Sequence, residues 1–123
     1  MLLTIDKLSR TPIYEQVVAQ LEMHIQLGSF SQDQALPSVR SLSLELGVNP
    51  NTLQKAYAEL ERRGLCYSVP GNGRFISPGA PEALRASRQA LLRDVAEKIG
   101  QLAQAGIPLS DIVSAVTRAY NEA

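Results

Sequence analysis

The sequence predicts a mainly α-helical fold with one small β-hairpin, and three observations point to it. Apolar residues recur at helical spacing in several segments of the 123-residue chain. These segments tend to follow Thr, Ser or Asn and to stop at Gly, the residue types that favour helix starts and ends. The Asn72-Gly73 dipeptide lies between two short runs and is a strong hairpin signal. We therefore expect helices and a hairpin over residues 1–78, followed by a two-helix C-terminal hairpin over 79–123.

The first helix is expected to begin at Thr11 and to end at Gly28. Thr11 is a suitable N-cap residue, and Pro12 would occupy the first helical position, where proline is tolerated best. The apolar residues of one helical face are Ile13, Tyr14, Val17, Val18, Leu21 and Ile25. Upstream, residues 3–5 are either a short strand or an arm that packs on the helices.

Two further helices are expected close together, separated by a three-residue break. The second runs from an N-cap at Ser38 to Gly47; residues 42–46 also alternate like a strand, but the flanking Ser and Gly favour the helix. The third begins at Asn49, because Pro50 suits the first helical position and keeps Asn49 out of helical geometry. Its core face comprises Leu53, Ala56, Tyr57 and Leu60, and its outward face Asn51, Gln54, Lys55 and Ala58.

A β-hairpin is expected directly after the third helix. Its strands are residues 65–69 and 74–77, joined by a turn over residues 70–73. Cys66 lies on the opposite side of the first strand from Leu65 and Tyr67, and is either a half-buried structural thiol or a redox sensor. No Lys, Arg or His adjoins it to lower its pKa, which favours the structural role.

Residues 78–81, Pro-Gly-Ala-Pro, are expected to form a hinge before two more amphipathic helices at 82–105 and 108–121. Apolar residues of the first recur in alternating four- and three-residue steps, as in a short coiled-coil seam. The apolar positions that we assign to a tail interface are Leu92, Val95, Ile99, Leu102, Ile112, Val116 and Tyr120.

Composition narrows the functional classes. The chain has no apolar run long enough to span a membrane and no signal-peptide pattern, and its single cysteine excludes an internal disulfide, so we expect a cytoplasmic protein. His24 is the only histidine and has no candidate partner for a metal site, and no motif calls for a cofactor. The net charge is zero over the whole chain and over residues 1–78, which counts against DNA binding. DNA binding would therefore depend on where the charges lie.

The order of helix, short break, helix and glycine-hinged hairpin is nevertheless typical of a winged helix-turn-helix. In that fold one helix crosses the phosphate backbone, the next enters the major groove, and the hairpin forms a wing beside it. Arg40, Lys55 and Arg74 fall on these elements, while most acidic residues fall elsewhere.

The segments LPSVRSLSLELGVNPNTLQKAYAELERRGL and GNGRFIS resemble the GntR family of bacterial transcription regulators. The opening PIYEQV and the short tail look most like its YtrA-type subfamily. The resemblance implies a non-enzymatic, DNA-binding regulator, more often a repressor, that dimerises through its tail on a palindromic operator. It also implies transporter genes as frequent targets. The tail is too small to be the ligand domain of larger members, so no effector is indicated.

The candidate DNA contacts come from three elements. The matching arginine of the family contacts DNA, and a guanidinium can hold a phosphate or a guanine edge. The start of the third helix offers N–H groups to phosphate, and its amides and hydroxyl can reach base edges, with Gln or Asn pairing naturally with adenine. In the wing, glycines permit close backbone approach, and an arginine can enter the minor groove or touch the backbone. These candidates are Arg40, Asn49, Asn51, Thr52, Gln54, Lys55, Gly71, Gly73 and Arg74.

Several residues depart from the family pattern. Pro50 stands where many members have a base-reading arginine, so operators of those members do not transfer to this chain. Asn72 stands where a basic wing residue is frequent, and Arg74 can replace it from nearby. Gln32-Asp33-Gln34 replaces a common Pro-Gly-acid turn, and Leu44 replaces a polar residue and is expected to be exposed.

Two other functions were weighed. A winged domain fused to a pyridoxal-phosphate enzyme is disfavoured because the chain is short and lacks a phosphate-binding glycine loop. A protein-interaction module with a degenerate DNA surface is favoured by the zero net charge, but the wing and the polar third helix argue for DNA.

Overall fold

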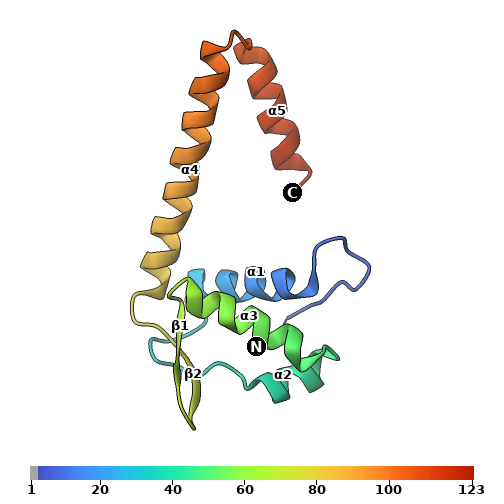
Figure 1. Ribbon diagram of the computed structural model, residues 1–123, viewed down its shortest axis with the longest axis vertical. Coiled ribbons are helices and arrows are strands. Elements are labelled where there is room, and N and C mark those ends of the chain that lie inside the picture. The colour runs from blue at the N-terminus through green and yellow to red at the C-terminus, as the bar shows by residue number, and fades with distance from the viewer. Residues whose placement is uncertain (1–2) are drawn as a thin grey trace. The chain divides into compact units, whose positions relative to one another are not determined.

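The computed structural model describes residues 3–123 and divides the chain into two compact units, one ending at Arg85 and one spanning residues 86–123 (Figure 1). The first unit holds the helices and hairpin of a winged helix, so the predicted fold class is confirmed. The elements are α1 (Ile13–Gln26), α2 (Val39–Leu46), α3 (Pro50–Arg62), β1 (Cys66–Val69), β2 (Gly73–Ile76), α4 (Ala80–Gln104) and α5 (Leu109–Asn121).

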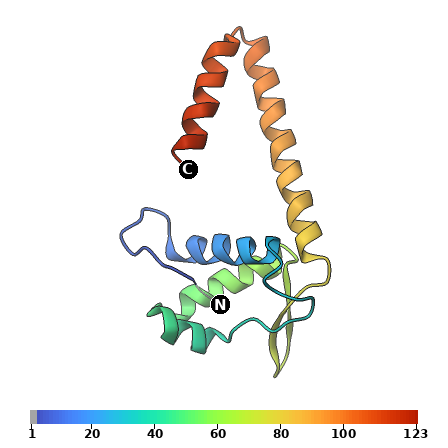
Figure 2. The same cartoon turned by 180° about the vertical axis from the view of Figure 1, so that it is seen from behind.

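Helix α1 packs against α3, and the two run side by side in both views (Figures 1 and 2). Its buried face comprises Val17, Val18, Leu21 and Ile25, as the apolar spacing predicted. The predicted Thr11 cap is wrong. Pro12 itself takes the N-cap position, with no side-chain cap. Instead, the Gln16 amide donates to the carbonyls of Asp6 and Thr11, both at 2.9 Å, which ties the incoming loop to the first turn.

The N-terminal segment is an arm and not a strand. Leu3 is buried in the core, and the backbone of Thr4 bonds to a side chain of α1. Thr4 N donates to Gln20 Oε1 at 2.8 Å, and Gln20 Nε2 donates back to Thr4 O at 2.6 Å. Because one glutamine satisfies both backbone groups, no partner strand is required.

The helix-turn-helix is fixed by its caps, as predicted. Ser38 Oγ accepts from Ser41 N at 3.0 Å, and Gly47 ends α2 in the left-handed conformation at φ 64°. Inside the break, the buried Ser43 hydroxyl donates to Val48 O at 2.6 Å. These bonds satisfy backbone groups that the short connection would otherwise leave unpaired.

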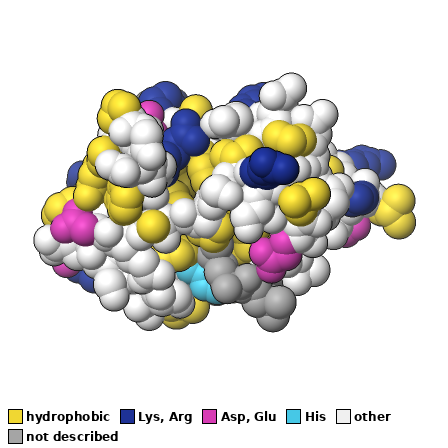
Figure 3. All heavy atoms as spheres, turned by 90° about the horizontal axis from the view of Figure 1, so that it is seen from below, with side chains coloured by type: hydrophobic (Ala, Val, Ile, Leu, Met, Phe, Trp, Pro, Cys, Tyr) yellow, Lys and Arg dark blue, Asp and Glu magenta, His cyan; other side chains and the backbone are white. Residues whose placement is uncertain are grey.

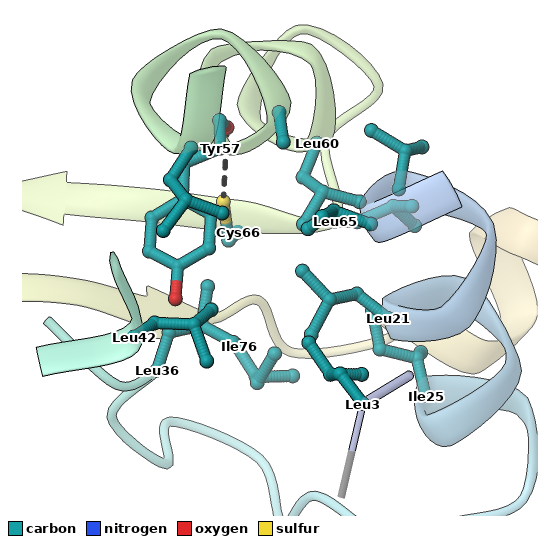
Figure 4. Close-up of a cluster of buried hydrophobic side chains, with 14 of the residues drawn as sticks. Leu3, Leu21, Ile25, Leu36, Leu42, Tyr57, Leu60, Leu65, Cys66 and Ile76 are labelled. Atoms are coloured by element: carbon teal, nitrogen blue, oxygen red, sulfur yellow. Dashed lines mark hydrogen bonds between the residues drawn. The ribbon is translucent and has the colours of Figure 1, made fainter. Parts of the chain in front are cut away.

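Tyr57 lies at the centre of the core, beside Leu36, Leu42 and Cys66 (Figure 4). It is only 1% exposed, yet its hydroxyl donates to Pro37 O at 2.6 Å. That bond joins α3 to the loop before α2. Burial raises the pKa of the Tyr57 hydroxyl, so it stays a neutral donor.

The first turns of α4 belong to the winged unit. Ala80 and Leu84 are buried in its core, and the division between the units falls after Arg85. The Pro-Gly-Ala-Pro segment was expected to be a hinge that ends a domain at residue 78. In the structure, Ala80 and Pro81 already lie in the helix. Both prolines and the glycine therefore stand at a helix start, which is also a favourable place for them.

The hairpin pairs antiparallel with Val69 opposite Gly73, so the connecting loop holds three residues, 70–72. A segment that the sequence did not predict extends this sheet. Ala35 bridges Phe75, and Leu36 N donates to the carbonyl of Arg74 at 2.9 Å. Tyr67 Oη donates to Asp33 Oδ1 at 2.7 Å on the same edge. The Gln32–Gln34 segment is therefore structural support for the wing.

The tail unit leaves its apolar faces uncovered. Its two helices diverge from the turn at Gly106 (Figures 1 and 2). Ile112 is buried. The exposed apolar side chains of this unit include Leu91, Leu92, Val95, Leu102, Leu109, Val113, Val116 and Tyr120. Within the described residues, no helix is both long and apolar enough to cross a bilayer.

The Tyr57 hydroxyl gives a direct stability prediction. Tyr57→Phe keeps the ring and leaves Pro37 O without its donor, so the free energy of unfolding should fall by about 1–2 kcal/mol. Urea denaturation followed by circular dichroism measures this. Tyr14→Phe is the matched control, because within the described residues the Tyr14 hydroxyl makes only an exposed bond to the adjacent Glu15 at 3.3 Å and its loss should change the stability little. Equal stability of the two variants would contradict a structural role for the bond.

Candidate nucleic-acid interface

The outward face of α3 is polar and accessible, as the sequence predicted. Asn49, Asn51, Gln54 and Lys55 are exposed, and Thr52 is half-buried. The opposite face carries Leu53, Ala56, Tyr57 and Leu60 into the core. Helix α3 therefore presents a surface rich in amides to solvent, while its apolar face fixes the orientation of that surface.

Asn49 performs a structural role that the sequence left open. Its Oδ1 accepts from Asn51 N at 2.8 Å, and Pro50 fills the first position of the helix. The side-chain oxygen thus serves as a cap, while the residue as a whole is exposed. Asn51 and Gln54 lie further along and have no capping task.

Lys55 lies against an aromatic side chain of α1. Its Nζ is 3.9 Å from the centroid of the Tyr14 ring, a cation–π contact that holds the ammonium toward α1. The helical spacing placed Tyr14 on the core side of α1, so this contact was not foreseen. Lys55 as a whole is nevertheless exposed, so the side chain is accessible to a phosphate.

Arg74 joins the wing to α3. Its Nη1 donates to Gln54 Oε1 at 3.0 Å, and its guanidinium carbon lies 5.6 Å from the centroid of the Tyr57 ring. Arg74 pairs with Ser68, one step in from the hairpin loop, and is half-buried. The structure thus brings Arg74 and Gln54 together, which neither local spacing nor the hairpin signal could show.

The two glycines of the wing lie at its tip. Gly71 and Gly73 are exposed with φ of 80° and 108°, and no heavy atom lies within 4 Å of a Cβ placed on either. The space around them is therefore open, and the glycines are required by the backbone conformation of the turn. An open tip without side chains at these two positions suits close approach of the backbone to a phosphate.

Arg40 extends from the first turn of α2 and is exposed. None of the salt bridges found within residues 3–123 includes Arg40. Lys7 adds a cation that the sequence analysis missed. Its Nζ donates to Gly47 O at 3.2 Å, at the turn between α2 and α3. Forty residues separate the pair, so no local pattern indicated it.

Glu59, near the end of α3, is neutralised by neighbouring arginines. Arg62 and Arg63 both donate to Glu59, and Arg63 also contacts Glu22 of α1. These hydrogen bonds lower the pKa of Glu59 to about 2. Seen from below, basic side chains are scattered among uncharged ones and do not form one continuous patch (Figure 3). The positive charge of the interface is therefore local and comes from a few side chains.

Cys66 is more deeply buried than expected. It is 3% exposed, and its thiol donates to Tyr57 O at 3.8 Å (Figure 4). Burial raises the pKa of the thiol to about 11, which favours a structural role over a redox sensor. Among the residues that the structure describes, no group of His, Cys, Asp and Glu side chains could hold a metal ion.

Comparison with known proteins supports the resemblance stated from the sequence. The profile of the bacterial regulatory proteins of the gntR family matches residues 13–76. The HTH-type transcriptional repressor YtrA of Bacillus subtilis is 38% identical over 93 residues, covering 76% of this chain and 72% of that protein. The resemblance to the YtrA-type regulators is therefore confirmed.

Solved structures agree with this assignment. YtrA from Sulfolobus acidocaldarius, a GntR-family transcription factor, superposes with a TM-score of 0.61 at 31% identity, covering 78% of this chain and 99% of that one. AraR(DBD) in complex with operator ORX1 superposes with a TM-score of 0.55 at 35% identity, covering 61% of this chain and 93% of that one.

Substitutions of Asn49 separate its cap from any contact of its amide. Asn49→Ser keeps an oxygen that can accept from Asn51 N, so the free energy of unfolding should stay within about 0.5 kcal/mol of wild type. Asn49→Ala removes the cap and should lower the free energy of unfolding by about 1 kcal/mol. Urea denaturation of the two variants tests this. If both lose the same stability, the cap is not the source of the effect.

Proposed function

The chain belongs to the GntR family of bacterial regulatory proteins, and from this premise we propose a transcriptional repressor that binds a palindromic operator as a homodimer. Its winged-helix unit is the DNA-binding domain of a transcriptional regulator. We propose in addition that it acts as a repressor, that two copies pair, that the operator is symmetric, and that the residues named below contact DNA.

The arrangement of α3 and the wing is the observation that supports DNA binding. The amide-rich face of α3 is held outward by a buried apolar face, next to a wing with an open glycine tip. A helix of this kind fits the major groove, and the wing can reach the adjacent backbone. The similar AraR domain was solved with its operator, which supports the same mode here. We assign DNA contact to Arg40, Asn49, Asn51, Thr52, Gln54, Lys55, Gly71, Gly73 and Arg74.

We assign dimerisation to the tail beyond the winged unit. Its helices expose many apolar side chains to water, and exposed apolar patches of this kind mark interaction sites. A second copy of the chain offers matching apolar faces. Pairing also raises affinity for DNA. One domain of zero net charge makes few phosphate contacts, whereas two linked domains bind their half-sites at high effective concentration. Their recognition helices would lie about 34 Å apart in successive major grooves.

Two further expectations complete the proposal. The regulator acts in the cytoplasm, where its DNA target lies, and it controls transporter genes, as regulators resembling YtrA often do. The alternative remains an interaction module whose DNA surface has degenerated. The zero net charge favours that alternative. The exposed cations of α2 and α3, together with the half-buried Arg74 of β2, favour DNA.

A gel shift with the DNA upstream of the chain's own gene tests the interface. Arg40→Ala combined with Gln54→Ala should weaken binding at least tenfold, because it removes a guanidinium and an amide from the proposed contact surface. Arg93→Ala combined with Gln101→Ala is the matched control, because both residues are exposed on α4. Equal shifts by wild type and by the interface variant would favour the interaction module.

Salt dependence provides a second measure of the same interface. If two subunits neutralise about eight phosphates, log K should fall with log salt concentration at a slope near −7. Fluorescence anisotropy between about 50 and 200 mM salt measures this slope. A slope flatter than about −2 would contradict phosphate neutralisation by a dimer.

One substitution that introduces a charge into the proposed dimer interface tests the assignment of the tail. Val116 is 51% exposed on α5, and Val116→Glu would place a carboxylate in the proposed interface. We expect wild type to sediment as a dimer and Val116→Glu as a monomer with unchanged helix content, because desolvating the charge is costly. Thr117→Glu, at an exposed neighbouring position, is the control and should remain dimeric. A monomeric wild type, or a dimeric Val116→Glu, would contradict the assignment.

A further inference from the structure

We infer that Arg74 is a positioning residue that sets the hydrogen-bonding polarity of Gln54. In this role it makes Gln54 present its amide N–H groups, and not its carbonyl oxygen, to the operator. The inference rests on the proposed function and adds a base preference to it. At the position that Gln54 faces, the operator should carry an acceptor edge, that of guanine or thymine, and not adenine.

The contact between the two side chains determines the orientation of the Gln54 amide. Arg74 Nη1 donates to Gln54 Oε1 at 3.0 Å. An arginine side chain has five N–H donors and no acceptor, so only the oxygen of the amide can face it. The bond is charge-assisted and therefore stronger than one between neutral groups. As long as the pair persists, Gln54 Nε2 points away from Arg74.

Arg74 is itself held in place, which makes it suitable for this task. Its guanidinium lies over the ring of Tyr57, a residue that is 1% exposed and anchored to Pro37 O. Its carbonyl accepts from Leu36 N at 2.9 Å, within the edge that supports the wing. Its Nε is buried and has no hydrogen-bond partner within the described residues. The bond to Gln54 is therefore important for satisfying the hydrogen-bond donors of the Arg74 guanidinium.

The polarity of Gln54 has a consequence for the base that it can read. Glutamine pairs bidentately with adenine when Oε1 accepts from N6 and Nε2 donates to N7. Both amide groups must then lie in the plane of the base, and the second lone pair of Oε1 must accept from N6 directly beside the Arg74 guanidinium. Two donors, one of them charged, would then crowd the same oxygen, which disfavours adenine. With Oε1 held by Arg74, Nε2 can still donate to guanine N7 or O6, or to thymine O4. The nearby guanidinium also favours acceptors over the N6 donor of adenine.

The sequence alone supported the opposite expectation, that Gln54 pairs with adenine. That expectation treats the residue as isolated on an exposed helix face. The contact from β2, twenty residues later in the chain, removes this freedom. Asn51 has no such partner in the contacts found and keeps the adenine pairing as its natural choice.

Operator selection from a random duplex pool tests the inference with the full-length protein. The variants are Arg74→Met, which keeps the length and removes the donors, and Gln54→Glu, which keeps two acceptors and removes the amide N–H groups. Arg93→Met, at an exposed site on α4, is the matched control for loss of one positive charge. Thermal melts monitored by circular dichroism confirm that each variant is folded.

The expected results form a pattern. Wild type and Arg93→Met should enrich guanine or thymine at the position that Gln54→Glu alters. Arg74→Met should shift that position toward adenine, by about tenfold in relative enrichment, because Gln54 is then free to pair bidentately. Gln54→Glu should shift it toward cytosine, whose N4 donates. Where guanine is selected, its replacement by 7-deazaguanine, which lacks the N7 acceptor, should weaken wild-type binding.

Other results would overturn the inference. A wild-type preference for adenine at that position would do so, and so would an unchanged preference in folded Arg74→Met. Should Arg74→Met not fold, Gln54→Glu decides alone, because retained selection of guanine or thymine shows that the amide N–H groups do not read the base. If wild type enriches no sequence, the proposed function itself fails, and this outcome is distinct from enrichment with the wrong base.

Discussion

The burial of the Tyr57 ring with a satisfied hydroxyl is the constraint on which the winged unit depends. The ring fills the core beneath α3, the hydroxyl holds the loop before α2, and the backbone carbonyl accepts from Cys66. Arg74 of the wing lies over the same ring. One residue thus links the recognition helix, the helix before it and the hairpin. Since a buried phenol without a partner would be costly, the geometry of all three elements is coupled.

Zero net charge is compatible with DNA binding because acidic residues near the end of α3 are engaged by its own arginines. Glu59 and Glu22 pair with Arg62 and Arg63, beyond the residues at the start of the helix. Over the short distances at which a phosphate is bound, screening by salt makes nearby charges count far more than the sum over the chain. The proposed contacts of Arg40 and Lys55 are therefore consistent with a balanced overall composition.

The sequence predicted the fold well where local chemistry decides and poorly where distant segments meet. Ser38, Gly47 and Asn49 marked helix ends because capping bonds join residues only a few positions apart. The Thr11 cap was wrong because the helix begins one residue later than expected, which puts Pro12 at the N-cap position. The sheet edge at Ala35 was invisible because it depends on a partner strand forty residues later. The same holds for the candidate interface. Apolar periodicity predicted which face of α3 points outward, but it could not predict the partners of the side chains on that face.

This difference matters most for specificity, because the base that a side chain reads depends on what its other atoms are doing. Asn49 uses its oxygen as a cap and Gln54 offers its oxygen to Arg74, so both amides have one end engaged before any ligand arrives. Groups held in this way lose little freedom on binding, which favours affinity. They also disfavour bases whose donor would have to share the engaged oxygen. A recognition surface on this fold is therefore defined jointly by α3 and by the elements that hold its side chains, and substitutions in the wing can change sequence preference without touching a base.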